Sequence, residues 1–148
     1  MTTAITSDTP LYTIGVVARM LGVSVHTIRM YERSGLLIPF KADSGQRQYS
    51  MRDIDRLRCL RIAITQEKIS IQGILRILSL TPCWSLIHCS ADDRTQCPSI
   101  KGHSSPCWTM RKNHDYCGVR ECRTCEVYRE FGDCRSIKDL LLQLLPSD

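Results

Sequence analysis

Several features are absent from this chain of 148 residues, and each absence excludes a class of protein. No apolar run reaches the roughly 18 residues that a membrane-spanning helix requires. The first ten residues contain no basic start followed by an apolar stretch, so we expect no secretory signal. Phosphate-binding loops, paired acid–base groups and nucleophile motifs are also missing. We therefore expect a cytoplasmic protein that has no membrane partner and is not an enzyme.

Cysteine is almost missing from the first half of the chain, which holds only Cys59 of the nine cysteines. Positive charge is distributed in the opposite way. Residues 1–80 carry 11 Lys and Arg against 6 Asp and Glu, whereas residues 81–148 carry 9 of each. A basic half suggests a polyanionic partner. Because Pro82 stops a helix, the simplest interpretation is two domains with different chemistry and a boundary near this proline.

The stretch YTIGVVARMLGVSVHTIRMYERSGLL predicts two short helices joined by a tight turn. Apolar residues recur at helical spacing in both, and Gly22 between them can supply a left-handed turn. The small Ala18 fits where two helices cross, and Ile28 anchors the second helix. This arrangement is typical of a helix-turn-helix. The prediction also uses Thr13 and Ser24 as caps and Ile14, Val17, Leu21 and Val25 as apolar contacts.

The next segment, SGLLIPFKADSGQRQYS, has two apolar ends around a polar tip that contains glycine, which predicts a short hairpin. Ser50 and Asp53 form a capping box that opens a third helix, and its arginines are expected to lie outside the core. Ser70 caps a last helix. The expected apolar stripes are Ile54, Leu57, Cys59 or Leu60, Arg61 and Ile64 on the third helix, and Ile71, Ile74, Leu75 and Leu78 on the last.

Residues 12–80 resemble the winged-helix DNA-binding domain of the MerR family of bacterial transcription regulators. The resemblance rests on the TIG start, the GVS-x-x-TIR-x-YE-R-x-GLL block, and the R-x-YS wing tip followed by D-I-x-R-L. The last helix, KISIQGILRILSL, is most similar to the heat-shock-repressor branch of that family. The family usually has an aromatic pair before the glutamate, where this chain has Met30 and Tyr31. The resemblance implies a transcription regulator that binds DNA.

Physical chemistry and the resemblance together indicate which residues contact DNA. A recognition helix enters the major groove, and a wing contacts the flanking backbone. Arg29 faces away from the apolar side of the second helix, and its guanidinium can pair with guanine or clamp a phosphate. Arg47 and Tyr49 match the backbone-contacting positions of the family, and Tyr31 is either a DNA contact or a half-buried core aromatic. The remaining candidates are Arg19, His26, Thr27 and Lys41.

The second half is rich in cysteine and poor in apolar residues. A segment of about 50 residues with so little core requires covalent or metal links. Trp84 and Trp108 are expected to form the scarce core, whereas Cys59 in the first half is expected to be a small buried apolar residue. Disulfides would fit a secreted scaffold, but a reducing cytosol opposes them, so metal binding is the favoured interpretation.

Two kinds of metal centre fit these cysteines. Cys122 and Cys125 form a C-x-x-C pair that can chelate one ion, although zinc would prefer two such pairs. The spacing Cys117-x4-Cys122-x2-Cys125, with a later Cys134, resembles that of plant-type ferredoxins. The spacing therefore slightly favours an iron–sulfur cluster over Zn²⁺, with these four cysteines as the first choice of ligands. The full set of candidates is Cys83, Cys89, Cys97, Cys107, Cys117, Cys122, Cys125 and Cys134.

The second half also resembles the small "two-CW" cysteine-rich modules of bacterial signalling proteins. The resemblance implies a metal or redox module in a sensor. Two alternatives stay open. The metal can be purely structural, or Cys122 and Cys125 can be the redox couple of a thiol or electron-transfer protein, whose usual βαβ context is missing. The matching residues are Cys83-Trp84, Cys97-Pro98, Cys107-Trp108, Cys117, Cys122, Cys125 and Tyr128.

Together these observations predict a mainly α fold in four segments. Residues 1–11 are expected to be a disordered tail, 12–80 the winged helix-turn-helix and 81–135 a cysteine-rich metal-binding or sensor module. Residues 136–148 predict an amphipathic helix that packs on its own chain or pairs across a dimer. The resemblance implies double-stranded promoter DNA as the partner, RNA polymerase as a further candidate partner, and a homodimer, although the long heptad run of MerR dimers is missing.

Overall fold

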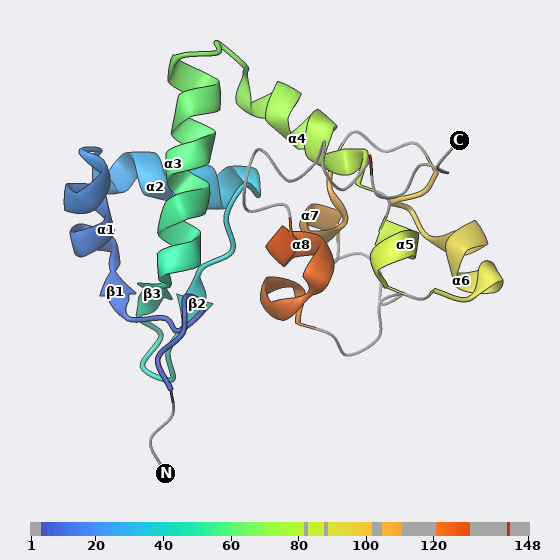
Figure 1. The fold of residues 1–148 in the computed structure, drawn as a ribbon, viewed down its shortest axis with the longest axis horizontal. Coiled ribbons are helices and arrows are strands. Elements are labelled where there is room, and N and C mark those ends of the chain that lie inside the picture. The colour runs from blue at the N-terminus through green and yellow to red at the C-terminus, as the bar shows by residue number, and fades with distance from the viewer. Residues whose placement is uncertain are drawn as a thin grey trace.

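The computed structural model describes residues 4–81, 83–87, 89–101, 105–110, 121–130 and 142. Within these residues the fold is mainly helical with a small three-stranded sheet, as the sequence predicts (Figure 1). No described helix is long and apolar enough to cross a membrane. The elements are β1 (Tyr12–Thr13), α1 (Ile14–Leu21), α2 (Val25–Ser34), β2 (Phe40–Lys41), β3 (Arg47–Tyr49), α3 (Met51–Thr65), α4 (Ile71–Ser79), α5 (Cys83–Leu86), α6 (Ala91–Gln96), α7 (Cys107–Met110), the 3-10 helix η2 (Cys122–Thr124) and α8 (Glu126–Glu130).

The turn between α1 and α2 forms as the sequence predicts. Gly22 ends α1 with a φ of 64°, and its N–H bonds to the carbonyls of Ala18 and Arg19. A residue with a side chain would be strained in this left-handed conformation. The Ser24 hydroxyl accepts a hydrogen bond of 3.1 Å from the Thr27 N–H and so caps α2. Thr13 occupies the equivalent position before α1, but its side chain makes no cap hydrogen bond.

The predicted hairpin after α2 is also confirmed, and a further strand, β1, pairs with it to form a three-stranded sheet. β2 and β3 pair antiparallel with Lys41 opposite Arg47, and Gly45 at the tip has a φ of 82°. We refer to this β2–β3 hairpin as the wing. β1 pairs with the other edge of β3, with Tyr12 opposite Tyr49. The sheet therefore joins β1, which directly precedes α1, to β3 of the wing. The sequence pattern did not indicate this pairing.

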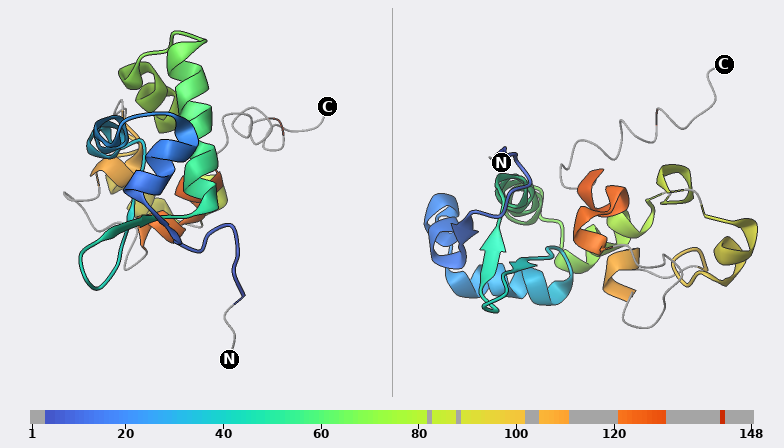
Figure 2. Two further views of the ribbon diagram at one scale, coloured as in Figure 1. Left: turned by 90° about the vertical axis from the view of Figure 1, so that its left-hand side faces the viewer. Right: turned by 90° about the horizontal axis from the view of Figure 1, so that it is seen from below.

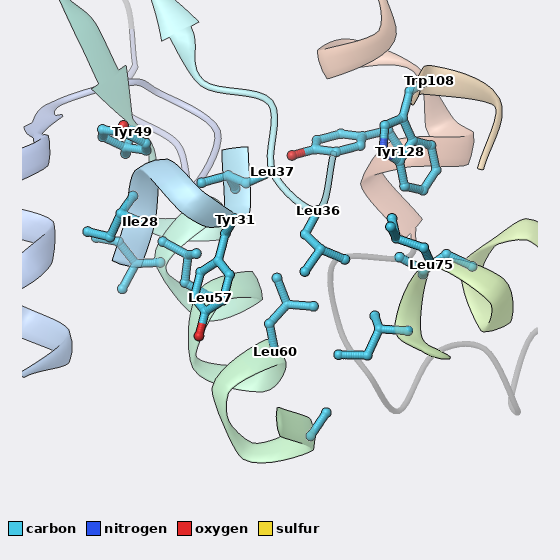
Figure 3. Packing of buried hydrophobic residues seen from close by; sticks show 14 of the residues in the cluster. Ile28, Tyr31, Leu36, Leu37, Tyr49, Leu57, Leu60, Leu75, Trp108 and Tyr128 are labelled. Atoms are coloured by element: carbon cyan, nitrogen blue, oxygen red, sulfur yellow. The ribbon is translucent and has the colours of Figure 1, made fainter. Parts of the chain in front are cut away.

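The core of the first half lies between α1, α2, α3 and α4. Ile28 of α2 and Leu57 of α3 are completely buried (Figure 3), and so is Ile54 of α3. Burying each of these side chains contributes roughly 1.5–3 kcal/mol relative to leaving it exposed. The predicted capping box of α3 is present, because the Ser50 side chain accepts from the Asp53 N–H and the Asp53 carboxylate accepts from the Ser50 N–H. Ser70 caps α4 as expected.

The prediction of a disordered tail is wrong for residues 4–11. The Ser7 carbonyl accepts a hydrogen bond of 3.0 Å from the Arg52 N–H, and the Leu11 N–H donates to the Tyr49 carbonyl at 3.0 Å. Asp8 lies 2.6 Å from Arg52 of α3 and 2.7 Å from Arg129 of α8. The polar composition that suggested disorder instead supplies groups that pair with α3 and β3.

The described part of the cysteine-rich module (residues 81–135) lies beside the first half, and the views of Figures 1 and 2 place its helices α5 and α6 away from α1 and α2. Its α8 packs against η2 and α5. Trp108 is buried as expected, whereas Trp84 is 43% exposed and does not serve the core. The helix predicted at 136–148 lies outside the described residues, apart from the exposed Leu142.

Candidate nucleic-acid interface

Helix α2 presents several of the predicted contact residues on its exposed face. His26 and Arg29 are exposed, while Ile28 between them is buried in the core. Thr27 is half-buried, and its hydroxyl lies 3.0 Å from that of the capping Ser24. The same cap that starts the helix therefore fixes Thr27, and Arg29 follows two residues later on the exposed side of α2.

The basic contact residues predicted outside α2 are exposed as well. Arg19 lies in the last turn of α1, Lys41 on β2 and Arg47 on β3. Lys41 and Arg47 are register partners across the wing, so two positive charges stand together on this hairpin. A recognition helix beside a basic wing is the arrangement by which winged helices bind a duplex, with the helix in the major groove and the wing at the phosphates.

Tyr31 corresponds to the core alternative of the sequence analysis rather than to a contact residue. Its side chain is 4% exposed and lies among the core residues of Figure 3. Burial raises the pKa of its hydroxyl. A side chain in this position helps to hold α2 in the core, and it does not lie on the surface that would meet DNA.

Tyr49 is also buried, with no exposed surface at all. Its hydroxyl donates a hydrogen bond to a carboxylate oxygen of Glu32 on α2. The other Glu32 oxygen lies 3.3 Å from the Nε of Arg47. Burial, together with the hydrogen bond to Glu32, raises the pKa of Tyr49. The Tyr49 hydroxyl therefore does not lie at the surface where a phosphate contact was expected, because it joins α2 to the wing.

Glu32 is a positioning residue that the sequence reasoning missed. Its side chain is 8% exposed and connects α2 to Tyr49 and Arg47 of β3. The signal was present, since Glu32 belongs to the YE pair of the quoted motif. Its role is positioning, because the carboxylate fixes the exposed Arg47 relative to the exposed Arg29.

Replacing Tyr49 by phenylalanine should weaken DNA binding without unfolding the domain. The variant loses one hydrogen bond to a buried carboxylate, which should cost about 1–2 kcal/mol of stability. Glu32 then holds the Arg47 side chain less firmly. Affinity for duplex DNA should fall roughly 3- to 10-fold, because the contact of Arg47 with a phosphate is weakened but not lost. Tyr12→Phe is the matched control, because Tyr12 is the register partner of Tyr49 and its hydroxyl makes no hydrogen bond to the described residues. Equal affinities for the two variants would contradict the positioning role of Tyr49.

Four of the candidate metal ligands line one pocket of the cysteine-rich module. Cys83 of α5, Cys89, Cys97 and Cys107 of α7 surround a small cavity of about 20 Å³ whose exposed lining is mostly apolar. All four are half-buried. The pocket gathers cysteines from positions up to 24 residues apart in sequence, which the sequence spacing did not indicate.

The other candidate ligands are separated from this pocket or lie outside the described residues. Cys122 and Cys125 flank η2, and the Cys125 N–H bonds to the Cys122 carbonyl at 3.1 Å. Cys117 and Cys134 fall outside the described residues. Within the described part of the chain, no group of three or more Cys, His, Asp or Glu side chains stands close enough to hold a metal ion. Cys59 differs from expectation, since it is half-buried and disulfide-bonded.

The cysteine-rich module is docked on the segment that connects α2 to the wing (residues 35–39). The Trp108 Nε1 donates a hydrogen bond of 2.7 Å to the Gly35 carbonyl, and the Ile38 N–H donates to the Tyr128 hydroxyl at 2.8 Å. The two rings meet edge to face with centroids 5.2 Å apart. Gly35 has a φ of 88°, and a side chain there would collide with Thr109. The connecting segment is therefore held from both of its ends by the module.

Arg56 completes this docking contact and corrects the expectation that the arginines of α3 lie outside. It is 3% exposed, and its Nε donates to the Leu36 carbonyl at 2.9 Å. Its Nη1 donates to the Tyr128 carbonyl at 2.8 Å, and the guanidinium carbon lies 4.0 Å from the centre of the Tyr128 ring. Burial lowers the pKa of this guanidinium. One side chain of α3 thus bonds to both the connecting segment and the module.

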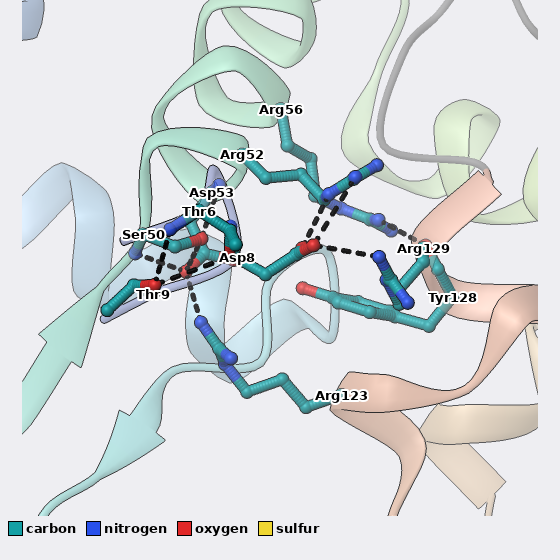
Figure 4. A network of polar contacts seen from close by, with 10 residues as sticks. All are labelled: Thr6, Asp8, Thr9, Ser50, Arg52, Asp53, Arg56, Arg123, Tyr128 and Arg129. Carbon is teal, nitrogen blue, oxygen red and sulfur yellow. Dashed lines mark hydrogen bonds and ion pairs between the residues drawn. The ribbon is translucent and has the colours of Figure 1, made fainter. Parts of the chain in front are cut away.

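An ion pair extends the contact at the start of α3 (Figure 4). Asp53, whose carboxylate already belongs to the capping box, lies 2.7 Å from the Nη2 of Arg123, and the side chains are 6% and 10% exposed. The Arg123 guanidinium also lies 5.7 Å from the centre of the Phe40 ring on the wing. A buried Asp–Arg pair with good hydrogen-bond geometry fixes orientation more than it adds stability. The module therefore contacts the wing as well as the segment that precedes it.

Comparison with known proteins identifies the first half. Residues 12–81 match the family described as MerR HTH family regulatory protein. A candidate heat shock protein HspR of Streptomyces coelicolor is 41% identical over 76 residues, which cover 51% of this chain and 50% of the relative. The mercuric resistance operon regulatory protein of Pseudomonas fluorescens is 46% identical over 52 residues, or 34% of this chain and 36% of the relative.

The transcriptional regulator TnrA of Bacillus subtilis is 40% identical over 50 residues, which cover 34% of this chain and 46% of the relative. The chain thus spans about half the length, or less, of these relatives. No solved structure gives a significant match. The matched segment begins at β1 and ends just after α4. Residues 12–81 are therefore a helix-turn-helix domain of the MerR family.

Proposed function

We propose that the chain is a cytoplasmic transcription regulator whose helix-turn-helix domain binds double-stranded promoter DNA and whose cysteine-rich module controls that binding. The observation that carries the proposal is the docking contact of Trp108, Tyr128 and Arg56 on the segment between recognition helix and wing. A change in the module that moves this segment would alter the spacing of Arg29 and Arg47. Control of DNA binding then requires only that the two states of the module differ in how they dock.

The exposed basic residues supply the DNA contacts of this proposal. Arg29 on α2 reads a base edge or clamps a phosphate, while Arg19, Lys41 and Arg47 neutralise phosphates. His26 and Thr27 lie beside Arg29 near the start of the same helix. Each phosphate contact releases counterions, so affinity should fall steeply as salt is raised. The relatives are named as regulators, which favours a regulator over an enzyme for this chain.

A metal ion or iron–sulfur cluster is the signal that we propose for the module. The chemistry of the donors fits, because half-buried cysteines in a mostly apolar pocket are the ligands that zinc and iron–sulfur clusters use. Cys83, Cys89, Cys97 and Cys107 would hold the group, in place of the Cys117-to-Cys134 set that the spacing favoured. When bound, the group would supply a rigid cross-link between these cysteines.

The described arrangement does not bring three of these donors to one point. Binding therefore has to draw α5 and α7 together, since each contributes one of the four cysteines. Trp108 directly follows Cys107 on α7 and bonds to Gly35. A movement of Cys107 toward a metal would accordingly be passed to the connecting segment. This is the physical route by which the module would act on the DNA-binding residues.

The metal content of anaerobically purified protein tests the sensing part of the proposal. We expect stoichiometric zinc by elemental analysis, or iron and sulfide with visible absorption. Changing Cys83 and Cys107 to serine should abolish binding, whereas Cys125→Ser should reduce it less. Protein that is well folded, colourless and free of metal would exclude a metal sensor. A bound metal whose removal leaves DNA affinity unchanged would favour a purely structural site.

A homodimer is part of the proposal because a pseudo-palindromic site is read by two copies of a winged helix. Ile77 of α4 and Leu80 just after it are 41% and 71% exposed, which leaves apolar surface at the end of the domain. RNA polymerase is the further partner that a promoter-bound regulator would contact. Sedimentation equilibrium of the full chain tests the dimer, and a monomer at the concentrations that bind DNA would exclude it.

A further inference from the structure

A second pocket lies where the N-terminal segment and the start of α3 meet η2 and α8. Its volume is small, about 10 Å³, which is close to the least that holds one water-sized species. Four arginines line it, together with the two aspartates Asp8 and Asp53 (Figure 4). The arginines are Arg52, Arg56, Arg123 and Arg129. The pocket joins the DNA-binding domain to the cysteine-rich module, and it is separate from the cysteine pocket.

The charges that line this pocket do not balance. Four guanidinium groups face two carboxylates, which leaves two positive charges in a partly buried site. Asp8 is shared between Arg52 and Arg129, and Asp53 is used by Arg123 and by the capping box. Among the described residues, Arg56 donates only to the carbonyl oxygens of Leu36 and Tyr128. Its charge is therefore buried without a carboxylate of its own, which is unfavourable unless an anion lies near it.

Several donors of the same arginines have no partner among the described residues. The Nη2 of Arg56, the Nε of Arg123 and the Nε of Arg129 are buried and donate no hydrogen bond within the described part of the chain. Arg56 as a whole is 3% exposed. Buried N–H groups are almost always satisfied, by protein, water or a bound ion. Three unsatisfied donors from three lining residues, with a charge excess of two, indicate an acceptor that carries negative charge.

We propose that this pocket binds a small inorganic anion of about the size of chloride. A water molecule would satisfy some donors, but it would leave the excess positive charge in place. A tetrahedral oxyanion needs more volume than the pocket offers. Bound between Arg56 of α3 and Arg129 of α8, the anion pins the module to the DNA-binding domain.

The location of the anion can be tested by crystals of the full chain grown in bromide. We expect an anomalous difference peak within hydrogen-bond distance of the Arg56 and Arg129 guanidinium groups. A second measurement compares the thermal unfolding midpoint in chloride and in gluconate at equal ionic strength. The midpoint should be about 3 °C higher in chloride, the shift expected when a bound ion is retained by the folded state alone.

Variants separate this site from general salt effects. Arg129→Gln should remove the difference between chloride and gluconate, and Arg129→Lys should reduce it, because lysine keeps the charge but lacks the Nε donor. Arg58→Gln is the control, since Arg58 is an exposed arginine of α3 outside the pocket and should leave the difference intact. A pocket without a bromide peak, together with equal midpoints in chloride and gluconate, would overturn the proposal and assign the space to water.

Discussion

Replacing Arg56 by methionine lowers the free energy of unfolding by about 2–4 kcal/mol, because the Leu36 and Tyr128 carbonyls lose their charged donor while remaining buried. Methionine fills much of the same volume, so the loss comes from hydrogen bonds and the cation–ring contact more than from a cavity. Chemical denaturation followed by circular dichroism measures the change. The effect is large because a single side chain bonds to the connecting segment and to the module.

The matched control for Arg56 is two residues further along the same helix. Arg58 is half-exposed, and among the described residues it pairs only with Asp55 at the surface. Changing Arg58 to methionine should lower the free energy of unfolding by less than about 0.5 kcal/mol. The docking itself can be followed in a Trp84→Phe background, where Trp108 is the sole tryptophan. Arg56→Met should shift the Trp108 emission to longer wavelength in the folded protein. Equal stability of the two methionine variants would mean that Arg56 is not a docking residue.

Replacing Arg29 by alanine weakens DNA binding roughly 5- to 150-fold, which corresponds to the loss of about 1–3 kcal/mol from one guanidinium contact. The residue is exposed, and no described partner holds it in the free protein, so stability should change little. Fluorescence anisotropy with a duplex recovered by in vitro selection measures the affinity. If Arg29 reads a base, repeating the selection with the variant should also relax sequence preference at one position.

Lys101→Ala serves as the control for Arg29. Lys101 is an exposed basic residue of the cysteine-rich module, outside the DNA-binding domain and outside the lining of the cysteine pocket. Both substitutions remove one positive charge, so any common loss of affinity reports the net charge alone. The salt dependence of binding should become shallower by about one ion for Arg29→Ala if the guanidinium contacts a phosphate. Identical losses for the two variants would show that α2 is not the recognition helix.

The helix-turn-helix and the wing could be predicted because their signals are local. Gly22 must be small for its left-handed φ, Ser24 must accept from the N–H three residues on, and Ser50 and Asp53 satisfy each other's N–H groups. Each of these requirements lies within four residues of sequence. The fold class followed from them, as did the burial of Ile28.

The docking contact could not be predicted in the same way. Arg56 occupies a helix position like those of its exposed neighbours, and it is buried only because Tyr128 packs on it from 72 residues away. Likewise, the sequence predicted Tyr49 as a DNA-contacting residue, whereas its hydroxyl donates a hydrogen bond to Glu32. Polar residues that pair across the fold carry no periodic signal. The same holds for Asp8, whose segment looked like a tail.

The cysteine ligands show the limits of spacing as evidence. The x4-x2 spacing favoured Cys117, Cys122 and Cys125, whereas the pocket gathers Cys83, Cys89, Cys97 and Cys107 from three separate segments. Short spacing indicates which cysteines can chelate locally, but the chain path decides which of them meet. The choice of metal stays a proposal for the same reason.

The affinity of the full chain for a selected DNA duplex, measured with the module loaded with metal and again after its removal, tests the central claim most directly. Coupling between two sites typically changes affinity about 5- to 150-fold, and we expect a change in that range. The change should shrink in the Arg56→Met variant, in which the module is no longer held to the connecting segment. Affinities that are equal with and without metal, in wild type and variant alike, would contradict control of DNA binding by the cysteine-rich module.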